Sequence, residues 1–95
     1  MITIVSQWIL REHQKENFKN IAAELVEKSG NEEGNHSYHL FEDRENPNVV
    51  AFIEEWESQA ALEAHKQSAH FASICPQLRA FQATPSQLSI YRQLI

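Results

Sequence analysis

Five side chains that can move or hold a proton lie within one stretch of the chain. His65 and His70 are candidate bases, because an imidazole has an unperturbed pKa of about 6.5. Tyr38 and Trp56 each carry one directed hydrogen-bond donor on an apolar body. Glu54 lies two residues before Trp56, and a carboxylate among apolar neighbours must be paired or have a raised pKa. Together these residue types favour chemistry in which a proton leaves the substrate and the resulting anion is held by donors.

Each of these side chains also has a structural interpretation. His65 is equally explained as a histidine at a helix end that caps carbonyl groups, and for His70 we favour simple packing beneath Phe71. Trp56 is as well explained by filling the core. Tyr38 can instead face solvent or a dimer partner. An ion pair across a dimer explains Glu54 better than a catalytic role does.

The spacing of the histidines predicts no metal site. His36 and His39 are three residues apart in an expected strand and therefore point to opposite faces. His65 and His70 would be about 140° apart on an unbroken helix, so only a break at Ser68 could bring them together. We also find no glycine-rich phosphate loop, no Gly-x-Ser-x-Gly and no nucleophile–base motif.

Hydrophobic patterning predicts the order β-α-β-β-α-β. The first and third strands carry apolar side chains on both faces, which indicates central strands, and the polar second strand suits a sheet edge. Gly30 is expected to end the first helix in the left-handed region. The expected elements are strands at 2–10, 35–42, 49–57 and 87–95, and helices at 14–29 and 59–67, with a further helical piece from Ser68 that Pro76 kinks or restarts.

Right-handed crossovers place both helical layers on the same face of the sheet, which gives a ferredoxin-like α+β fold. The other sheet face then has no helix to cover it, although it carries apolar side chains. An exposed apolar face is unstable in a monomer, so we expect a homodimer packed through this face. The chain has 95 residues, and we expect residues 1–95 to form one domain.

Composition excludes several classes of protein. The formal net charge is −5 and no stripe of Lys or Arg occurs, which argues against a nucleic-acid partner. No apolar run approaches the roughly 20 residues that span a membrane, and the N-terminus lacks the pattern of a signal peptide. Cys75 is the only cysteine, so no internal disulfide can form, and we expect a reducing, cytoplasmic setting.

The stretch from Gly34 to Phe71 carries a specific pattern of residues. It runs through Tyr38, an acidic Asn-Pro turn, Glu54-Glu55-Trp56, the segment Ala-Leu-x-x-His that ends at His65, and His70-Phe71. This pattern resembles the antibiotic biosynthesis monooxygenase domain family, especially its small quinol-monooxygenase-like members. The resemblance implies a dimeric α+β barrel of two ferredoxin-like subunits.

The resemblance also implies oxygenation of a small aromatic or quinol-type substrate by molecular oxygen, without metal, flavin or haem. Such a reaction needs a base, a donor that holds the anion and a dry site. We therefore expect His65, Trp56 and Tyr38 to be catalytic. The side chains expected to line the pocket are His70, Phe71, Glu54 and Phe52.

Relatives on the same fold carry out different reactions, so two alternatives stay open. One is an isomerase or lyase that works through an enolate and needs no oxygen. The other is a ligand-binding dimer without catalysis, whose sign would be a narrow or filled pocket with His65 paired to a neighbour. Haem degradation is disfavoured, because Cys75-Pro76 stands where haem-degrading relatives carry an axial histidine.

Overall fold

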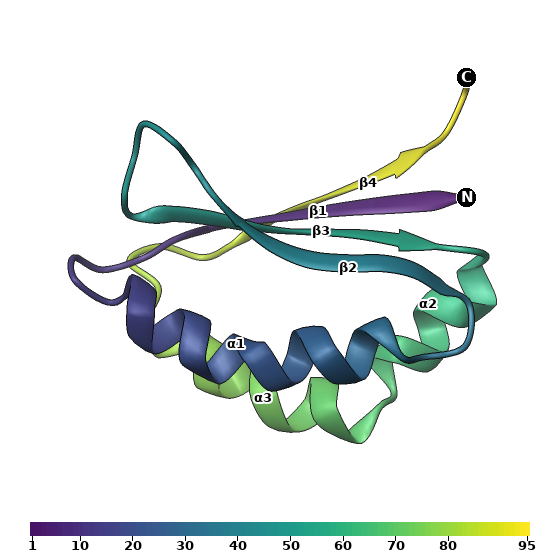
Figure 1. Ribbon diagram of the computed structural model, residues 1–95, viewed down its shortest axis with the longest axis horizontal. Helices are drawn as coiled ribbons and strands as arrows, with labels where there is room; N and C mark the ends of the chain where they lie inside the picture. The colour runs from purple at the N-terminus through teal and green to yellow at the C-terminus, as the bar shows by residue number, and fades with distance from the viewer.

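A four-stranded antiparallel sheet forms one layer of the molecule and three helices form the other (Figure 1). The computed structural model describes residues 1–95. The strand order is β2-β3-β1-β4, so the first and third strands are central, as the patterning predicts. The elements are β1 (Ile2–Ile9), α1 (Lys15–Gly30), β2 (Asn35–Glu42), β3 (Val49–Trp56), α2 (Gln59–Lys66), α3 (Ala69–Arg79) and β4 (Gln87–Arg92).

Burial alternates strictly along β3, because successive side chains of a strand point to opposite faces of the sheet. Its buried residues are Val50, Phe52, Glu54 and Trp56, and they face the helices. Residues of β1 and β2 that pair with them, such as Ile4 and Tyr38, are buried on the same face. The core therefore lies between the sheet and the helical layer.

Helix α1 buries one stripe against the sheet, formed by Phe18, Ala22, Leu25 and Ser29. Its apolar members follow the helical spacing that the sequence shows. The expectation for Gly30 is wrong: this residue is the last one in the helix, and the chain leaves through Asn31 with ordinary helical angles. The glycine with a positive φ is Gly34, at +84°, because the turn into β2 lies there.

A short joint separates α2 from α3. Ser58 caps α2 by accepting a hydrogen bond from the backbone N–H of Ala61, and Ser68 caps α3 in the same way from Phe71. Pro76 lies inside α3, which runs on to Arg79, so the proline does not start a new helix. The break at Ser68 redirects the chain between His65 and His70.

The sheet face opposite the helices is uncovered. It carries Ile9, Phe41 and Tyr91, whose exposed fractions are 40%, 49% and 57%. Strand β4 lies at the sheet edge beyond the helices (Figure 1), so its helix-side residues Leu88 and Ile90 are exposed as well. None of the three helices is both long enough and apolar enough to cross a membrane.

Candidate active site

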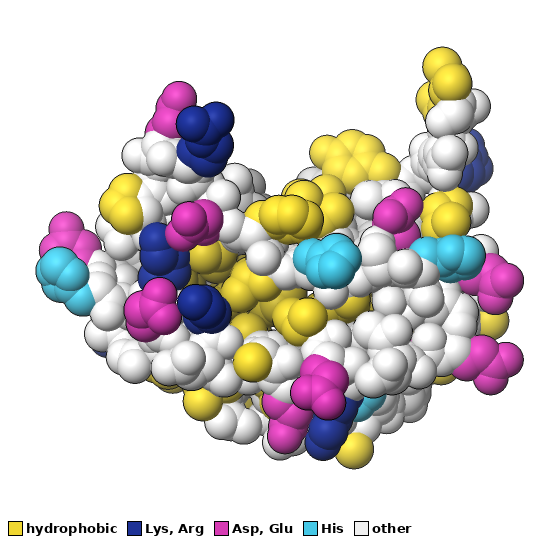
Figure 2. All heavy atoms as spheres, in the orientation of Figure 1, with side chains coloured by type: hydrophobic (Ala, Val, Ile, Leu, Met, Phe, Trp, Pro, Cys, Tyr) yellow, Lys and Arg dark blue, Asp and Glu magenta, His cyan; other side chains and the backbone are white.

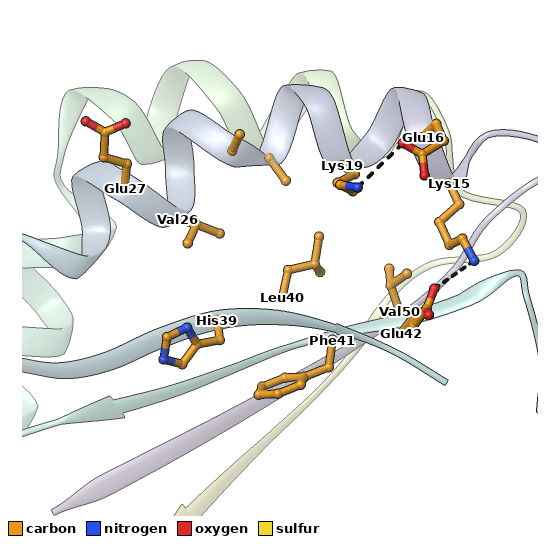
Figure 3. A pocket seen from close by; sticks show the side chains of 12 residues that line it. Lys15, Glu16, Lys19, Val26, Glu27, His39, Leu40, Phe41, Glu42 and Val50 are labelled. Atoms are coloured by element: carbon orange, nitrogen blue, oxygen red, sulfur yellow. Dashed lines mark hydrogen bonds and ion pairs between the residues drawn. The ribbon is translucent and has the colours of Figure 1, made fainter. Parts of the chain in front are cut away.

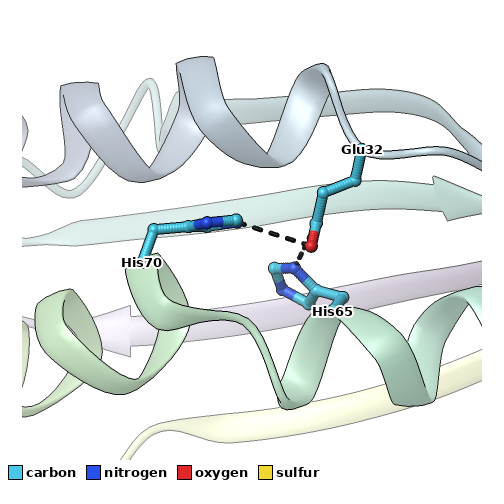
Figure 4. A group of neighbouring side chains, drawn as sticks. All are labelled: Glu32, His65 and His70. Atoms are coloured by element: carbon cyan, nitrogen blue, oxygen red, sulfur yellow. Dashed lines mark hydrogen bonds and ion pairs between the residues drawn. The ribbon is translucent and has the colours of Figure 1, made fainter.

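The joint between α2 and α3 brings together three side chains that are distant in the sequence (Figure 4). His65 lies in the last turn of α2 and His70 in the first turn of α3. Glu32 comes from the connection between α1 and β2 and points between the two imidazole rings. One donor atom from each residue lies within 4.8 Å of the others. We call Glu32, His65 and His70 the histidine cluster.

His65 is held by a short hydrogen bond. Its Nδ1 lies 2.6 Å from Oε2 of Glu32. Because a carboxylate only accepts, the Nδ1 of His65 carries the proton and donates it, which leaves Nε2 with a free lone pair. The side chain of His65 is 2% exposed, and this burial lowers the pKa of the imidazole, although Glu32 partly opposes the shift. His65 is therefore neutral near pH 7.

His70 approaches the second oxygen of the same carboxylate. Its Nε2 lies 3.5 Å from Oε1 of Glu32, and this buried nitrogen makes no hydrogen bond. The side chains of His70 and Glu32 are 14% and 18% exposed, so the cluster reaches the surface on their side. From the sequence, His70 is expected simply to pack beneath Phe71. The structure also places its ring beside a carboxylate, which that expectation does not include.

Aromatic rings surround His65. The ring centroids of Trp56, Phe71 and Tyr38 lie 4.6, 5.0 and 5.5 Å from that of the imidazole. Trp56 is fully buried, so its role as core filling holds. Tyr38 is buried on the helix-covered face, not turned toward solvent or a dimer partner. Burial and the nearby Glu54 raise the pKa of the Tyr38 phenol, so its hydroxyl keeps its proton.

Glu54 forms a second polar pair inside the core. Its Oε1 accepts a hydrogen bond of 2.9 Å from Nε1 of Trp56. The carboxyl is buried, which raises the pKa of Glu54 to about 7 although the hydrogen bond from Trp56 opposes the shift. The preferred interpretation of Glu54, an ion pair across a dimer, is wrong, since this side chain lies on the helix-covered face of the sheet.

The structure gathers most of the expected site residues around the histidine cluster. Tyr38, Trp56 and Phe71 contact His65, while Glu54 contacts Trp56. Phe52 reaches His65 only through Tyr38, against which it packs with 5.9 Å between the ring centroids. Sequence reasoning missed Glu32, because it lies in a connection with no periodic pattern. The only signal for it is indirect: a buried histidine requires a partner.

An open groove of about 550 Å³ runs between α1 and β2 (Figure 3). Its apolar floor includes Ala22, Val26, Leu40 and Val50, and a 2.8 Å ion pair between Lys15 and Glu42 crosses one end. Figure 2 shows a hollow between the sheet and the helical layer that is lined by hydrophobic side chains and has charged groups at its rim. The groove contains none of the seven expected site residues. It supplies space without a buried base, whereas the histidine cluster supplies a base in packed surroundings.

Tyr38 contacts the histidine cluster and is followed along its strand face by a residue of the groove. Leu40 lines the groove, and Tyr38 is the next residue of β2 on the same face of the strand. The other side of Tyr38 contacts the ring of His65. A neutral histidine that is oriented by a carboxylate and lies beside a protonated phenol can accept a proton and stabilise an anion. The indole N–H of Trp56 is already taken by Glu54. Cys75 adds no nucleophile, because burial raises the pKa of its thiol.

Comparisons with known proteins agree with this architecture. Residues 1–77 match the model of the antibiotic biosynthesis monooxygenase family. A Bacillus subtilis protein named "Putative monooxygenase YcnE" is 35% identical over 71 residues, which cover 75% of each chain. A conserved protein from Methanosarcina mazei superposes with a TM-score of 0.95 at 29% identity, over 98% of this chain and 92% of its own. A solved antibiotic biosynthesis monooxygenase gives 0.93 at 28% identity, over all of both chains.

Proposed function

Because this chain belongs to the antibiotic biosynthesis monooxygenase family, we propose that it oxygenates a small phenol or quinol without a cofactor. The observation that carries the proposal is the 2.6 Å contact between Glu32 and His65. This contact fixes the imidazole as a neutral base inside a ring of aromatic side chains. The fold and the family support a monooxygenase-type activity, and the base supplies the first step of such a reaction.

His65 is proposed to start the reaction by accepting a proton from the substrate hydroxyl at Nε2. The resulting electron-rich anion can pass an electron to molecular oxygen. One oxygen atom then enters the ring, and the other leaves as water with two protons and two electrons that the substrate gives up, so the product is a quinone. Glu32 stabilises the imidazolium that forms, since its carboxylate already accepts from Nδ1. Tyr38 is the proposed donor to the substrate anion, and low local polarity strengthens such a contact. Trp56, also expected to be a donor, already gives its one N–H to Glu54, so it is proposed only to shape the surroundings of His65.

The substrate is proposed to enter by the groove between α1 and β2. Its volume of about 550 Å³ fits the usual range for small-molecule sites, roughly 300–1,000 Å³. The apolar floor suits one aromatic ring. Tyr38 contacts the ring of His65 and precedes the groove residue Leu40 on the same face of β2. A rotation of the Tyr38 side chain would therefore open the path from the groove to the base.

The functional unit is proposed to be a homodimer. Exposed apolar side chains lie on the uncovered sheet face and along β4, and burial against a second copy removes them from water. This arrangement is the dimeric barrel expected from the sequence. Small-molecule substrate and molecular oxygen are the other proposed partners.

Oxygen uptake with a panel of hydroquinones, measured in chelator-treated protein, tests the proposed reaction. We expect uptake by the wild type and a loss of roughly 100-fold or more in His65→Ala, which removes the base. Glu32→Gln keeps the shape but removes the charge that stabilises the imidazolium, so we expect a smaller loss. His36→Gln changes an exposed histidine of β2 that lies outside the groove and is the matched control.

No uptake by the wild type would reject the oxygenase, and so would equal rates for all of these proteins. Turnover that is the same with and without air would select the isomerase or lyase alternative. One observation favours the non-catalytic alternative as the second candidate: His65 is paired with Glu32 and closely surrounded by aromatic rings. Saturable binding of the same hydroquinones without any turnover would establish that candidate.

A further inference from the structure

We propose that Glu32, His65 and His70 form a binding site for a zinc ion. Their donor atoms are Oε1 or Oε2 of Glu32, Nδ1 of His65 and Nε2 of His70 (Figure 4). One ligand atom from each of the three residues lies within 4.8 Å of the others. In a tetrahedral zinc site with bonds of about 2.0–2.2 Å, ligand atoms are roughly 3.4 Å apart. The distance between Nε2 of His70 and Oε1 of Glu32 is 3.5 Å, close to the separation of two ligands in such a site.

The unsatisfied nitrogen of His70 is a second observation in favour of a ligand. Nε2 is buried and makes no hydrogen bond, and a buried polar atom without a partner needs an explanation. A ring nitrogen that faces a carboxylate at 3.5 Å is placed to share a cation with it. Nothing in the proposed reaction uses this nitrogen.

The donor set selects the kind of ion. Two imidazoles and one carboxylate suit zinc and related transition metals, and the same set of two histidines and one glutamate holds zinc in known sites. Magnesium and calcium prefer oxygen ligands and octahedral or larger shells. Three protein ligands leave a fourth position of a tetrahedral ion for water. We therefore assign zinc and exclude the hard ions.

Charge and access also fit a divalent cation. One carboxylate faces two imidazoles, so the cluster offers negative charge to a cation, and binding releases the proton on Nδ1 of His65 to water. Lys66 is the cation that opposes binding, but it pairs with Glu63 at 3.5 Å. The side chains of Glu32 and His70 are partly exposed, which gives the ion a path from solvent.

Zinc at this site regulates the proposed reaction and is not a cofactor for it. The ion takes the carboxylate and Nδ1 that hold His65 as a base, so bound zinc lowers oxygen uptake. This consequence rests on the proposed function, whereas the binding itself does not. Zinc binding is therefore measured without substrate, and oxygen uptake is measured without metal, so each can fail alone.

Competition with a chromophoric chelator tests the site in metal-free, tag-free protein. We expect one zinc per chain and no binding of magnesium. Glu32→Gln and His70→Gln should each weaken zinc binding by at least about tenfold, and His39→Gln should leave it unchanged. Histidine ring signals in NMR spectra should shift on zinc addition for His65 and His70 alone.

Circular dichroism of each variant confirms that it is folded before its affinity is compared. Absence of saturable zinc binding to the wild type would overturn the proposal. So would full affinity in both Glu32→Gln and His70→Gln, or a loss of affinity in His39→Gln, since either result would place the ion on other side chains.

Discussion

Glu54 places a carboxyl group in the core of the molecule, and the loss of folding stability that this burial causes depends on pH. Burial raises the pKa of Glu54 to about 7, so the folded protein favours the protonated acid. The unfolded chain has the ordinary value of 4.5 and loses the proton first as the pH rises. The penalty for burying the charge is therefore absent below about pH 4.5, grows up to about pH 7 and stays constant above it.

Glu54→Gln should remove this pH-dependent penalty. The amide oxygen still accepts from Nε1 of Trp56, but no charge is buried. Relative to the wild type, the variant should gain roughly 3 kcal/mol in free energy of unfolding between pH 4.5 and pH 8, which is the upper limit from the shift in pKa. Urea denaturation at a series of pH values measures the gain. A constant difference between the two proteins across this range would contradict the prediction.

Residue types predicted much of the candidate site, but contacts between distant residues did not follow from them. His65, Trp56, Tyr38 and Phe71 carry a recognisable pattern, and they do lie together. Glu32 lies 33 residues from His65 in a connection whose conformation only the packed elements determine. The sequence also could not show which face of the sheet holds Glu54, because both faces of β3 are apolar.

At the scale of elements, the turn between α1 and β2 positions Glu32 and depends on Gly34. The φ of Gly34 is +84°, and an added Cβ would lie 2.6 Å from Cβ of Ala61 in α2. The turn thus packs directly against α2, the helix that carries His65 in its last turn. Gly30 differs, since an added Cβ there meets nothing within 4 Å.

Gly34→Ala and Gly30→Ala should have opposite effects on stability. The first combines a strained backbone with a clash against α2, and we expect a loss of about 1–3 kcal/mol or more. The second lies in a helix, where alanine is favoured by roughly 0.5–1 kcal/mol over glycine. Chemical denaturation of both variants measures the two changes. Equal stability of the two would show that the turn does not need its glycine.

Elements with a clear hydrophobic period were predictable, and their ends were not. The alternation in β3 and the stripe of α1 follow from burial of one face, so their positions agree with the structure. The error at Gly30 arose because the chain leaves α1 through Asn31 and needs its positive φ only at Gly34. Likewise, the course of α3 through Pro76 depends on packing that no local rule supplies.

The uncovered sheet face determines how the whole molecule meets a second copy. Ala51 lies at its centre in β3, between Gln7 of β1 and Phe41 of β2. Our proposed dimer buries this position in an apolar interface, where a charge without a partner is costly. Ala72 is exposed on α3. An aspartate there adds the same charge at a position in contact with water, so Ala72→Asp is the control.

Ala51→Asp should therefore dissociate the dimer, and Ala72→Asp should not. Light scattering after size-exclusion chromatography should give the mass of a monomer for Ala51→Asp. For the wild type and for Ala72→Asp it should give the mass of a dimer. Circular dichroism checks that the dissociated variant keeps its fold. A wild type that is monomeric at all concentrations would contradict the proposed dimer, as would a dimeric Ala51→Asp.

The place of β1 in the sheet has a consequence for synthesis on the ribosome. Of the four strands, β1 is translated first, yet both of its edges pair with strands made later, β3 and β4. Until β3 emerges, β1 displays unpaired N–H and C=O groups on both sides together with apolar side chains. The nascent chain is therefore most prone to aggregation early, and its folding waits for long-range contacts, which slows it.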